Sequence, residues 1–171
     1  GDERLRRKAL LDCAVDHGAG WVLAVDPAER IESALADRIR DLVRADGLVA
    51  YELRLRAMFS ESEYRVDGGW GLFAARRLFS IRPGFRYDRA GLADHRVGFG
   101  DHWYPSDTPY RIIKEDLNIY DFRTATAERR RRLRDLRLHL DPVAEQRPFA
   151  YESLLHEKGD MHPIPADRPY H

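Results

Sequence analysis

The sequence predicts an α/β fold, and three observations lead to this prediction. The first 43 residues read as a helix, a short apolar strand and a second helix, which is how an α/β layer begins. Two later stretches, residues 48–59 and 117–122, are rich in the β-branched and aromatic residues typical of strands. With 171 residues, of which 43% are hydrophobic, the chain is long enough for one domain with a sizeable core.

The N-terminal elements follow from apolar spacing. Residues 3–16 are expected to form a helix that ends at His17-Gly18. Its apolar face is expected to contain Leu5, Leu10, Cys13 and Ala14. Trp21 to Val25 is an apolar run of strand length, and Pro27 suits the first turn of the next helix because its nitrogen has no hydrogen to donate. The apolar residues that then recur at helical spacing are Ile31, Leu35, Ile39, Leu42 and Val43.

The second half of the chain mixes strands with irregular segments. Residues 64–82 are expected to form short strands around a turn at Gly68-Gly69. Residues 84–110 have no periodicity, and such a long irregular segment in a compact domain is more often functional than idle. A helix is expected over residues 125–140, with its inward side formed by Leu133, Leu136 and Leu140.

Two units are expected along the chain. Residues 1–141 form the predicted domain. Residues 142–171 contain five of the nine prolines, so we expect an extended tail that packs on the domain. No apolar segment reaches the length of a membrane-spanning helix.

Charge and cysteine content exclude several classes of function. Lys plus Arg and Asp plus Glu both total 29, so no overall field attracts nucleic acid or an anionic membrane, and any polyanion site must be local. The single cysteine, Cys13, allows no intrachain disulfide and no cysteine metal cage, which favours the cytoplasm; we expect it to be a small core residue. Arginine far outnumbers lysine, as is typical of GC-rich bacterial genomes.

Acids and imidazoles in two places are candidates for chemistry. Asp26 and Glu29 follow the first apolar strand, where two carboxylates within one turn can hold a divalent cation; acids that favour a first helical turn are the alternative interpretation. The stretch DHRVGFGDHWYP contains acids and imidazoles, for which three interpretations are open. They bind a metal, they transfer a proton, or they face solvent without a chemical role. The aromatic pair of this stretch either stacks on a sugar or anchors the loop. The residues concerned are Asp94, His95, Asp101, His102, Trp103 and Tyr104.

Two arginine groups are candidates for contacts with an anion. Arg76 and Arg77 follow a Gly-rich turn and precede an apolar stretch, so one of them can reach a phosphate. Arg129 to Arg132 are consecutive and therefore fan around the predicted helix. They form no single recognition face, and a solvated helix is the favoured interpretation.

Several of these motifs, in this order, resemble family 2 glycosyltransferases of the GT-A fold. WVLAVDPAERIE is similar to the strand and acidic motif of that family, written Trp-Val-Leu-x-x-Asp-Ala-Asp-Glu. YRVDGGWGLFAARRLFSIR resembles acceptor-side strands in which a Gly-Trp turn leads to Arg-Leu-Phe. In a bacterial subgroup of the family, a His-Trp loop is followed by a strand and by a closing helix with a tail. These three parts are similar, in this order, to GDHWYP, DLNIYDF and RRRRLRDLRLHLDP…FAYESLLHEKG.

The resemblance implies the C-terminal part of a GT-A-like, Rossmann-related mixed sheet with flanking helices and a long irregular loop. It implies transfer of a sugar, with inversion, from a nucleotide-sugar donor to a glycan, lipid or small acceptor, assisted by Mn²⁺ or Mg²⁺. The metal ligands are expected to be Asp26, Glu29 and His102. The general base is expected to be Asp94 or Asp101, with Glu29 as a further candidate. Substrate contacts are expected from Trp70, Arg76, Arg77, Trp103 and Tyr104.

The chain departs from the family pattern at three points. The second aspartate of the acidic motif, which is the main metal contact, falls on Ala28, and a histidine of the subgroup falls on Asp121. Only residues 1–20 precede the acidic strand, so we expect the N-terminal nucleotide-binding half to be missing. Two interpretations stay open: a glycosyltransferase-like enzyme, or a non-catalytic, degenerate binding or interaction module of the same ancestry. A sheet edge left by the missing half would permit a homodimer.

Overall fold

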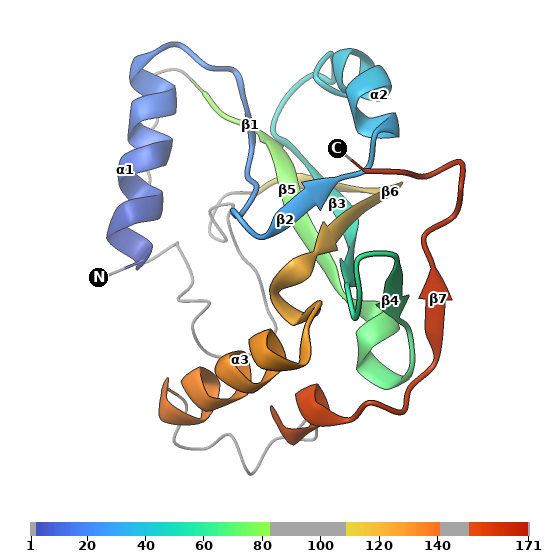
Figure 1. Cartoon of the computed structure of the whole chain (residues 1–171). Coiled ribbons are helices and arrows are strands. Elements are labelled where there is room, and N and C mark those ends of the chain that lie inside the picture. The colour runs from blue at the N-terminus through green and yellow to red at the C-terminus, as the bar shows by residue number, and fades with distance from the viewer. Residues whose placement is uncertain (1–2, 83–108, 141–150, 171) are drawn as a thin grey trace.

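The computed structural model describes residues 3–82, 109–140 and 151–170 (Figure 1). In this part of the chain, five strands form a curled mixed sheet in the order β1-β5-β3-β6-β2. The strands are β1 (Trp21–Leu23), β2 (Glu29–Ile31), β3 (Val49–Ala57), β5 (Ala74–Ser80) and β6 (Arg111–Asp121). With helices on the sheet, the α/β class is confirmed.

Three strands of the sheet end on the same side. β1 and β3 are both antiparallel to β5, which lies between them, and β6 is parallel to β3. β1, β3 and β6 therefore run in one direction, and their carboxyl ends meet at one end of the sheet. Asp26 follows β1 and Asp121 ends β6, so both acids lie at this end. Crevices at the carboxyl ends of strands are where α/β folds bind ligands.

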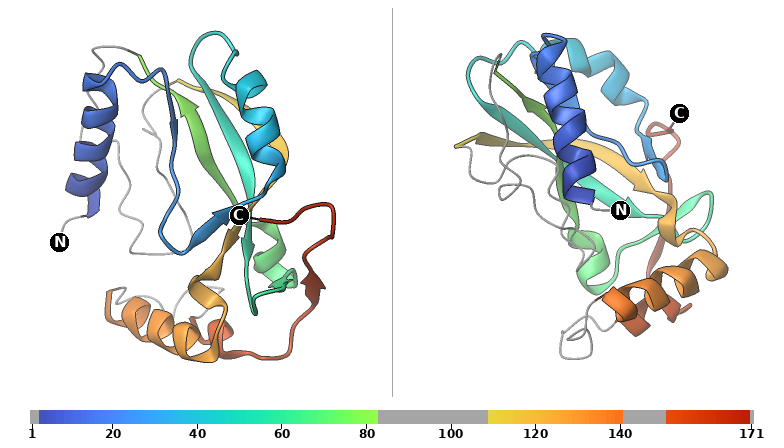
Figure 2. Two further views of the ribbon diagram at one scale, coloured as in Figure 1. Left: turned by 45° about the horizontal axis from the view of Figure 1, so that its top comes forward. Right: turned by 90° about the vertical axis from the view of Figure 1, so that its left-hand side faces the viewer.

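Two helices cover opposite faces of the sheet. Leu11 of α1 (Glu3–Asp16) packs in a core cluster with Phe79 of β5, whereas Leu35 of α2 (Ala34–Leu42) packs in another cluster with Leu78. Successive side chains of a strand point to opposite faces, so the helices lie on the two sides of the sheet. Figure 2 shows α1 and α2 separated by the strands. No helix among the described residues is both long and apolar enough to span a membrane.

The carboxyl end of the sheet is covered by short elements and by the tail. The helical elements here are η1 (Gly68–Leu72), η3 (Phe122–Thr124), α3 (Ala127–Leu140) and η5 (Tyr151–Leu155). A second sheet pairs β4 (Glu63–Arg65) with β7 (Met161–Pro163) of the tail. Tyr151 and Leu154 are buried against Ala57 and Trp70, so the described part of the tail packs on the domain.

The prediction that a helix begins at Pro27 is wrong. Residues 26–29 form a turn, Glu29–Ile31 is an edge strand, and α2 begins at Ala34. The residues of this strand find backbone partners in β6, where Ile31 lies opposite Ile119. Hydrogen bonds to β6 satisfy the backbone groups that a longer helix would have satisfied internally. Apolar residues at helical spacing do not reveal such pairing with a distant strand.

The apolar faces expected for α1 and α3 are also wrong in part. Leu5 and Leu10 are 50% exposed and Leu136 is 53% exposed, while Cys13 lies on the surface. Buried arginines share the inward positions with apolar residues: Arg7 lies beside Leu11 and Val15 on α1, and Arg130 and Arg137 are buried on α3. The guanidinium of Arg130 lies 3.8 Å from the ring centre of Phe59 and donates a hydrogen bond to the Thr124 carbonyl (3.0 Å). A long apolar stem and a flat, hydrogen-bonding head allow arginine to be buried in this way.

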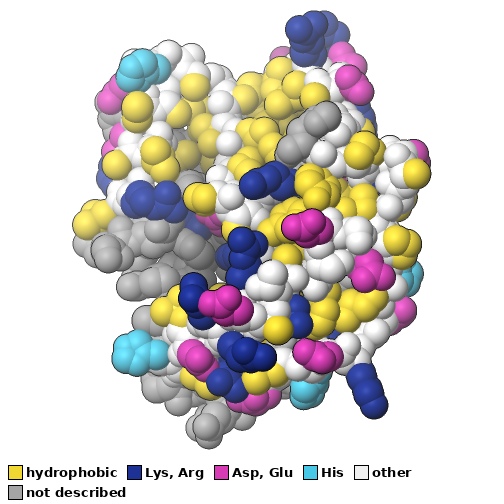
Figure 3. Space-filling model, viewed as in Figure 1, with side chains coloured by type: hydrophobic (Ala, Val, Ile, Leu, Met, Phe, Trp, Pro, Cys, Tyr) yellow, Lys and Arg dark blue, Asp and Glu magenta, His cyan; other side chains and the backbone are white. Residues whose placement is uncertain are grey.

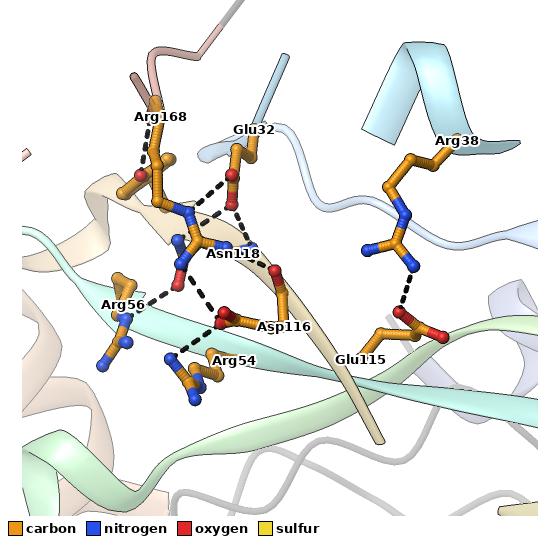
Figure 4. A network of polar contacts seen from close by, with 9 residues as sticks. Glu32, Arg38, Arg54, Arg56, Glu115, Asp116, Asn118 and Arg168 are labelled. Atoms are coloured by element: carbon orange, nitrogen blue, oxygen red, sulfur yellow. Dashed lines mark hydrogen bonds and ion pairs between the residues drawn. The ribbon is translucent and has the colours of Figure 1, made fainter. Parts of the chain in front are cut away.

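A polar network ties the end of the tail to the sheet (Figure 4). Arg168 donates to Glu32 (2.7 Å) and to Asp116 (3.1 Å). Glu32 is buried and also accepts from the backbone N–H and the side-chain amide of Asn118, at 2.6 and 2.8 Å. Arg56 completes the set by donating to the Asn118 oxygen (2.9 Å). The buried carboxylate of Glu32 thus obtains its positive partner from the tail.

We predict that Arg168→Ala lowers the free energy of unfolding by about 1–3 kcal/mol, because the buried side chain of Glu32 would lose its cationic hydrogen-bond partner. Urea denaturation measures this change. Arg44→Ala is the matched control, since Arg44 pairs with Asp41 on an exposed surface, and it should cost less than about 0.5 kcal/mol. Equal stability of both variants would show that the tail contact does not stabilise the domain.

Candidate functional site

The sequence Asp-Pro-Ala-Glu forms a tight turn at the carboxyl end of the sheet. The backbone N–H of Glu29 donates to the carbonyl of Asp26 (2.9 Å), and the Asp26 N–H donates to the Glu29 carboxylate (2.9 Å). Pro27 suits the second position of such a turn because its φ angle is already set and no N–H is needed. β1 and β2 are the two edge strands, so the turn carries the chain across the end of the sheet.

An ion pair inside the fold joins this turn to the middle of the sheet. Arg77 of β5 donates to Oε1 of Glu29 and lies 3.6 Å from Oδ2 of Asp26. Both side chains of the Glu29–Arg77 pair are fully buried. β5 and β2 are separated by β3 and β6 in the sheet, so this contact requires the sheet to curl. Arg77 thereby holds the two acids of the motif close together.

A second acid–arginine pair extends the site. Asp121 lies opposite Glu29 in the β2–β6 pairing, and it accepts from the backbone N–H and from Nε of Arg123, both at 2.9 Å. Nη2 of Arg123 also lies 3.9 Å from Oε1 of Glu29. We call Asp26, Glu29, Arg77, Asp121 and Arg123 the carboxylate–arginine cluster. Its members come from β2, β5 and β6 and from the segments that follow β1 and β6.

Burial shapes the electrostatics of the cluster. Desolvation raises the pKa of Glu29 to about 7, and the charge of Arg77 opposes this rise. Asp26 and Asp121 add to the rise, since their negative charges disfavour a third one. Nearby, burial and the charge of Arg123 lower the pKa of Arg137 to about 10. A carboxyl group that titrates near neutral pH can take up or release a proton under physiological conditions.

Two neighbouring pockets open on the outer side of the turn. A pocket of about 570 Å³ is lined by Pro27, Ala28, Arg30, Glu61, Phe122, Ala125, Thr126, Arg129 and Tyr170. A pocket of about 380 Å³ is lined by Ala28, Phe122, Arg123, Arg129, Arg132, Leu133 and Leu136. They share Ala28, Phe122 and Arg129, and we call them the Ala28 pockets. Figure 3 shows basic side chains gathered where β2 approaches α3.

The structure brings together three of the residues predicted from sequence, namely Asp26, Glu29 and Arg77. Arg76 lies apart from them and pairs with Glu52 (3.4 Å). Trp70 is 3% exposed, and its ring packs edge-on against Phe73, so it is not part of the cluster. The remaining predicted residues lie outside the described part of the chain, and their roles stay predictions. They are Asp94, His95, Asp101, His102, Trp103 and Tyr104.

The described residues do not form a site for the predicted divalent cation. Among them, no group of three His, Cys, Asp or Glu side chains could hold a metal ion. Ala28 has no ligand atom, and the two carboxylate oxygens of Glu29 accept from Arg77 and from the Asp26 N–H. Mg²⁺ needs a near-octahedral set of oxygen ligands, and these residues alone do not provide one. His102 stays a predicted ligand outside the described residues.

Sequence reasoning missed several residues of the site. Asp121 appeared only as a departure from a family pattern, although an acid at the end of a strand was the same signal that identified Asp26. Arg123 follows two residues later and carried no signal of its own. Arg30 and Arg129 reach the Ala28 pockets only because β2 and the start of α3 meet there.

Comparisons of the chain with models of protein families, with curated proteins and with solved structures gave no match. The resemblance to family 2 glycosyltransferases therefore stays a prediction from the sequence motifs. The chemistry of the site rests on its own geometry.

We predict that Glu29 makes the stability of the fold depend on pH. Its pKa is about 7 in the fold and 4.5 in its ordinary state, so the folded chain binds the extra proton between these values. The stabilisation is complete below pH 4.5 and is lost as the pH rises to about 7, by up to about 3 kcal/mol. Urea denaturation across this range, with Glu29→Gln as the reference that cannot titrate, measures the difference. A stability difference that instead grows with pH would mean that Arg77 dominates and keeps Glu29 ionised.

Proposed function

We propose that this chain is a glycosyltransferase-like protein that transfers a sugar from a nucleotide-sugar donor to a glycan, lipid or small acceptor, with inversion at the anomeric carbon. The observation that supports this most is the gathering of Asp26, Glu29 and Asp121 at the carboxyl ends of β1 and β6. The motif that resembles the family's acidic motif forms the centre of this cluster. A partial GT-A-like sheet is part of the same proposal.

We assign Asp26 the contact with the donor. Its side chain keeps 11% of its surface exposed, whereas that of Glu29 is fully buried. A carboxylate accepts hydrogen bonds from neighbouring hydroxyl groups, such as those of a ribose or a hexose. Asp26 therefore has the chemistry and the access that a sugar contact requires.

We assign Glu29 the role of positioning Asp26 and Arg77. One of its oxygens binds the Asp26 backbone N–H and the other binds Arg77, so it sets the direction of both groups. In the inverting reaction a carboxylate takes the proton from the acceptor hydroxyl as that oxygen attacks the anomeric carbon and the diphosphate leaves. Asp94 or Asp101 remain the predicted bases, because the oxygens of Glu29 are already engaged.

A non-catalytic binding module is the second candidate, and Ala28 is the observation that favours it. The methyl group replaces the acid that resembles the family's main metal contact. Such a module would bind a sugar or nucleotide without turnover. Release of nucleoside diphosphate from nucleotide sugars in the presence of acceptor sugars separates the two candidates, since only the enzyme produces it.

We predict that Asp26→Asn weakens binding of a nucleotide sugar at least about tenfold, because the amide presents one acceptor where the carboxylate presents two. Isothermal titration calorimetry of the full chain with uridine- and guanosine-diphosphate sugars, with and without Mn²⁺, measures this. Asp41→Asn is the matched control, because Asp41 lies exposed on α2, away from the cluster. Absence of binding by any of these donors to the unsubstituted chain would refute the proposed function.

A further inference from the structure

We propose that the Ala28 pockets bind the diphosphate group of a nucleotide through Arg30 and Arg129, without a divalent cation. The inference rests on the proposed function, since it names how that same site would hold the charged part of the donor. The described residues beside Ala28 lack the ligand set that the predicted cation would need.

The Ala28 pockets concentrate positive charge in a chain whose formal net charge is +0. Among the described residues that line them, four are arginines and one is a glutamate. The glutamate is Glu61, and two of the arginines face other acids, since Arg123 pairs with Asp121 (2.7 Å) and Arg132 with Glu128 (2.6 Å). Arg30 and Arg129 therefore supply the local positive charge that attracts an anion although the whole molecule does not.

Arg30 and Arg129 differ from most other arginines near the site. Among the residues that the structure describes, no carboxylate lies within ion-pair distance of either guanidinium. Arg30 donates to the backbone carbonyls of Pro27 (3.1 Å) and Glu29 (2.8 Å), and Arg129 donates to that of Phe122 (3.1 Å). These bonds orient each group and leave further N–H donors, because a guanidinium carries five. Oriented guanidinium groups with donors to spare suit the oxygens of a phosphate.

Ala28 and Arg129 line both pockets, and Arg30 lines the larger one. The Ala28 carbonyl accepts from the Phe122 N–H (2.8 Å), so the segments that anchor Arg30 and Arg129 are hydrogen-bonded to each other at this residue. An aspartate here would place a carboxylate beside both guanidinium groups and compete with an anionic ligand. The methyl group of Ala28 leaves both guanidinium groups available to an anion. The residue that offers no ligand atom to a metal therefore preserves the arginine site.

The size and lining of the pockets suit a nucleotide. The larger one is about 570 Å³, within the range of small-molecule sites. Phe122 and Tyr170, whose ring centres are 5.2 Å apart, line it together with Thr126. Aromatic rings offer a surface for a nucleobase or a sugar, while the guanidinium groups face the phosphates. The ligand class is therefore a nucleoside diphosphate, free or as part of a sugar donor.

The test measures binding of uridine, guanosine and deoxythymidine diphosphates to the full chain by calorimetry in EDTA. Arg30→Ala and Arg129→Ala should each weaken binding about tenfold or more. Arg131→Ala is the matched control, because Arg131 is an exposed residue of the same helix that lines neither pocket, and it should leave binding unchanged. Ala28→Asp should weaken binding in EDTA, and Mn²⁺ should restore it.

Each contrary outcome has a distinct meaning. Binding that requires Mn²⁺ and is unaffected by Arg30→Ala and Arg129→Ala would overturn this inference and leave the proposed function standing. Inorganic pyrophosphate that binds as tightly as the nucleotides would overturn the nucleotide part of the inference. If neither the nucleoside diphosphates nor the nucleotide sugars bind with or without Mn²⁺, both proposals fail.

Discussion

The buried ion pair between Glu29 and Arg77 is the constraint on which the carboxyl end of the sheet depends. The two residues belong to strands that are separated by two others in the sheet, so their contact is possible only in a curled sheet. Removing one partner of such a pair typically costs about 3–5 kcal/mol, because the other charge stays in a dry environment. The pair also sets the position of Asp26, whose backbone and carboxylate both lie against it.

Arginine has a structural role throughout this chain. Arg65 is buried, binds Asp67 at 2.6 Å and donates to the backbone carbonyls of Ser153 and His156, which joins β4 to the tail. Arg130 connects α3 to Phe59 and Thr124 in the same manner. A guanidinium satisfies several carbonyls at once and stacks on rings, so it can replace the apolar contacts that a helix normally makes. The high arginine content is therefore compatible with a zero net charge and with a packed fold.

The turn at Asp26–Glu29 combines a structural and a proposed functional task. It joins the two edge strands across the end of the sheet, and its proline and its reciprocal hydrogen bonds explain that geometry completely. The inner side of the turn carries the carboxylates, and the outer side carries Ala28 with its two pockets. The proposed sugar contact and the proposed diphosphate contact would thus lie on two sides of one short segment.

The sequence by itself determined the α/β class, the first helix and the strands within residues 21–25, 48–59 and 64–82, because apolar spacing is a local signal. It also singled out Asp26 and Glu29, because an acid at the end of a strand is a local signal too. It misplaced the start of α2 and the inward faces of α1 and α3. Only the tertiary structure decided that Glu29 enters an edge strand and that Arg77 rather than Arg76 meets the acids. It also decided that Asp121 and Arg123 join this cluster and that Arg129 lines the neighbouring pockets. Those contacts link residues about 50 to 100 positions apart through a curled sheet, and no local pattern records which distant side chain will meet a buried charge.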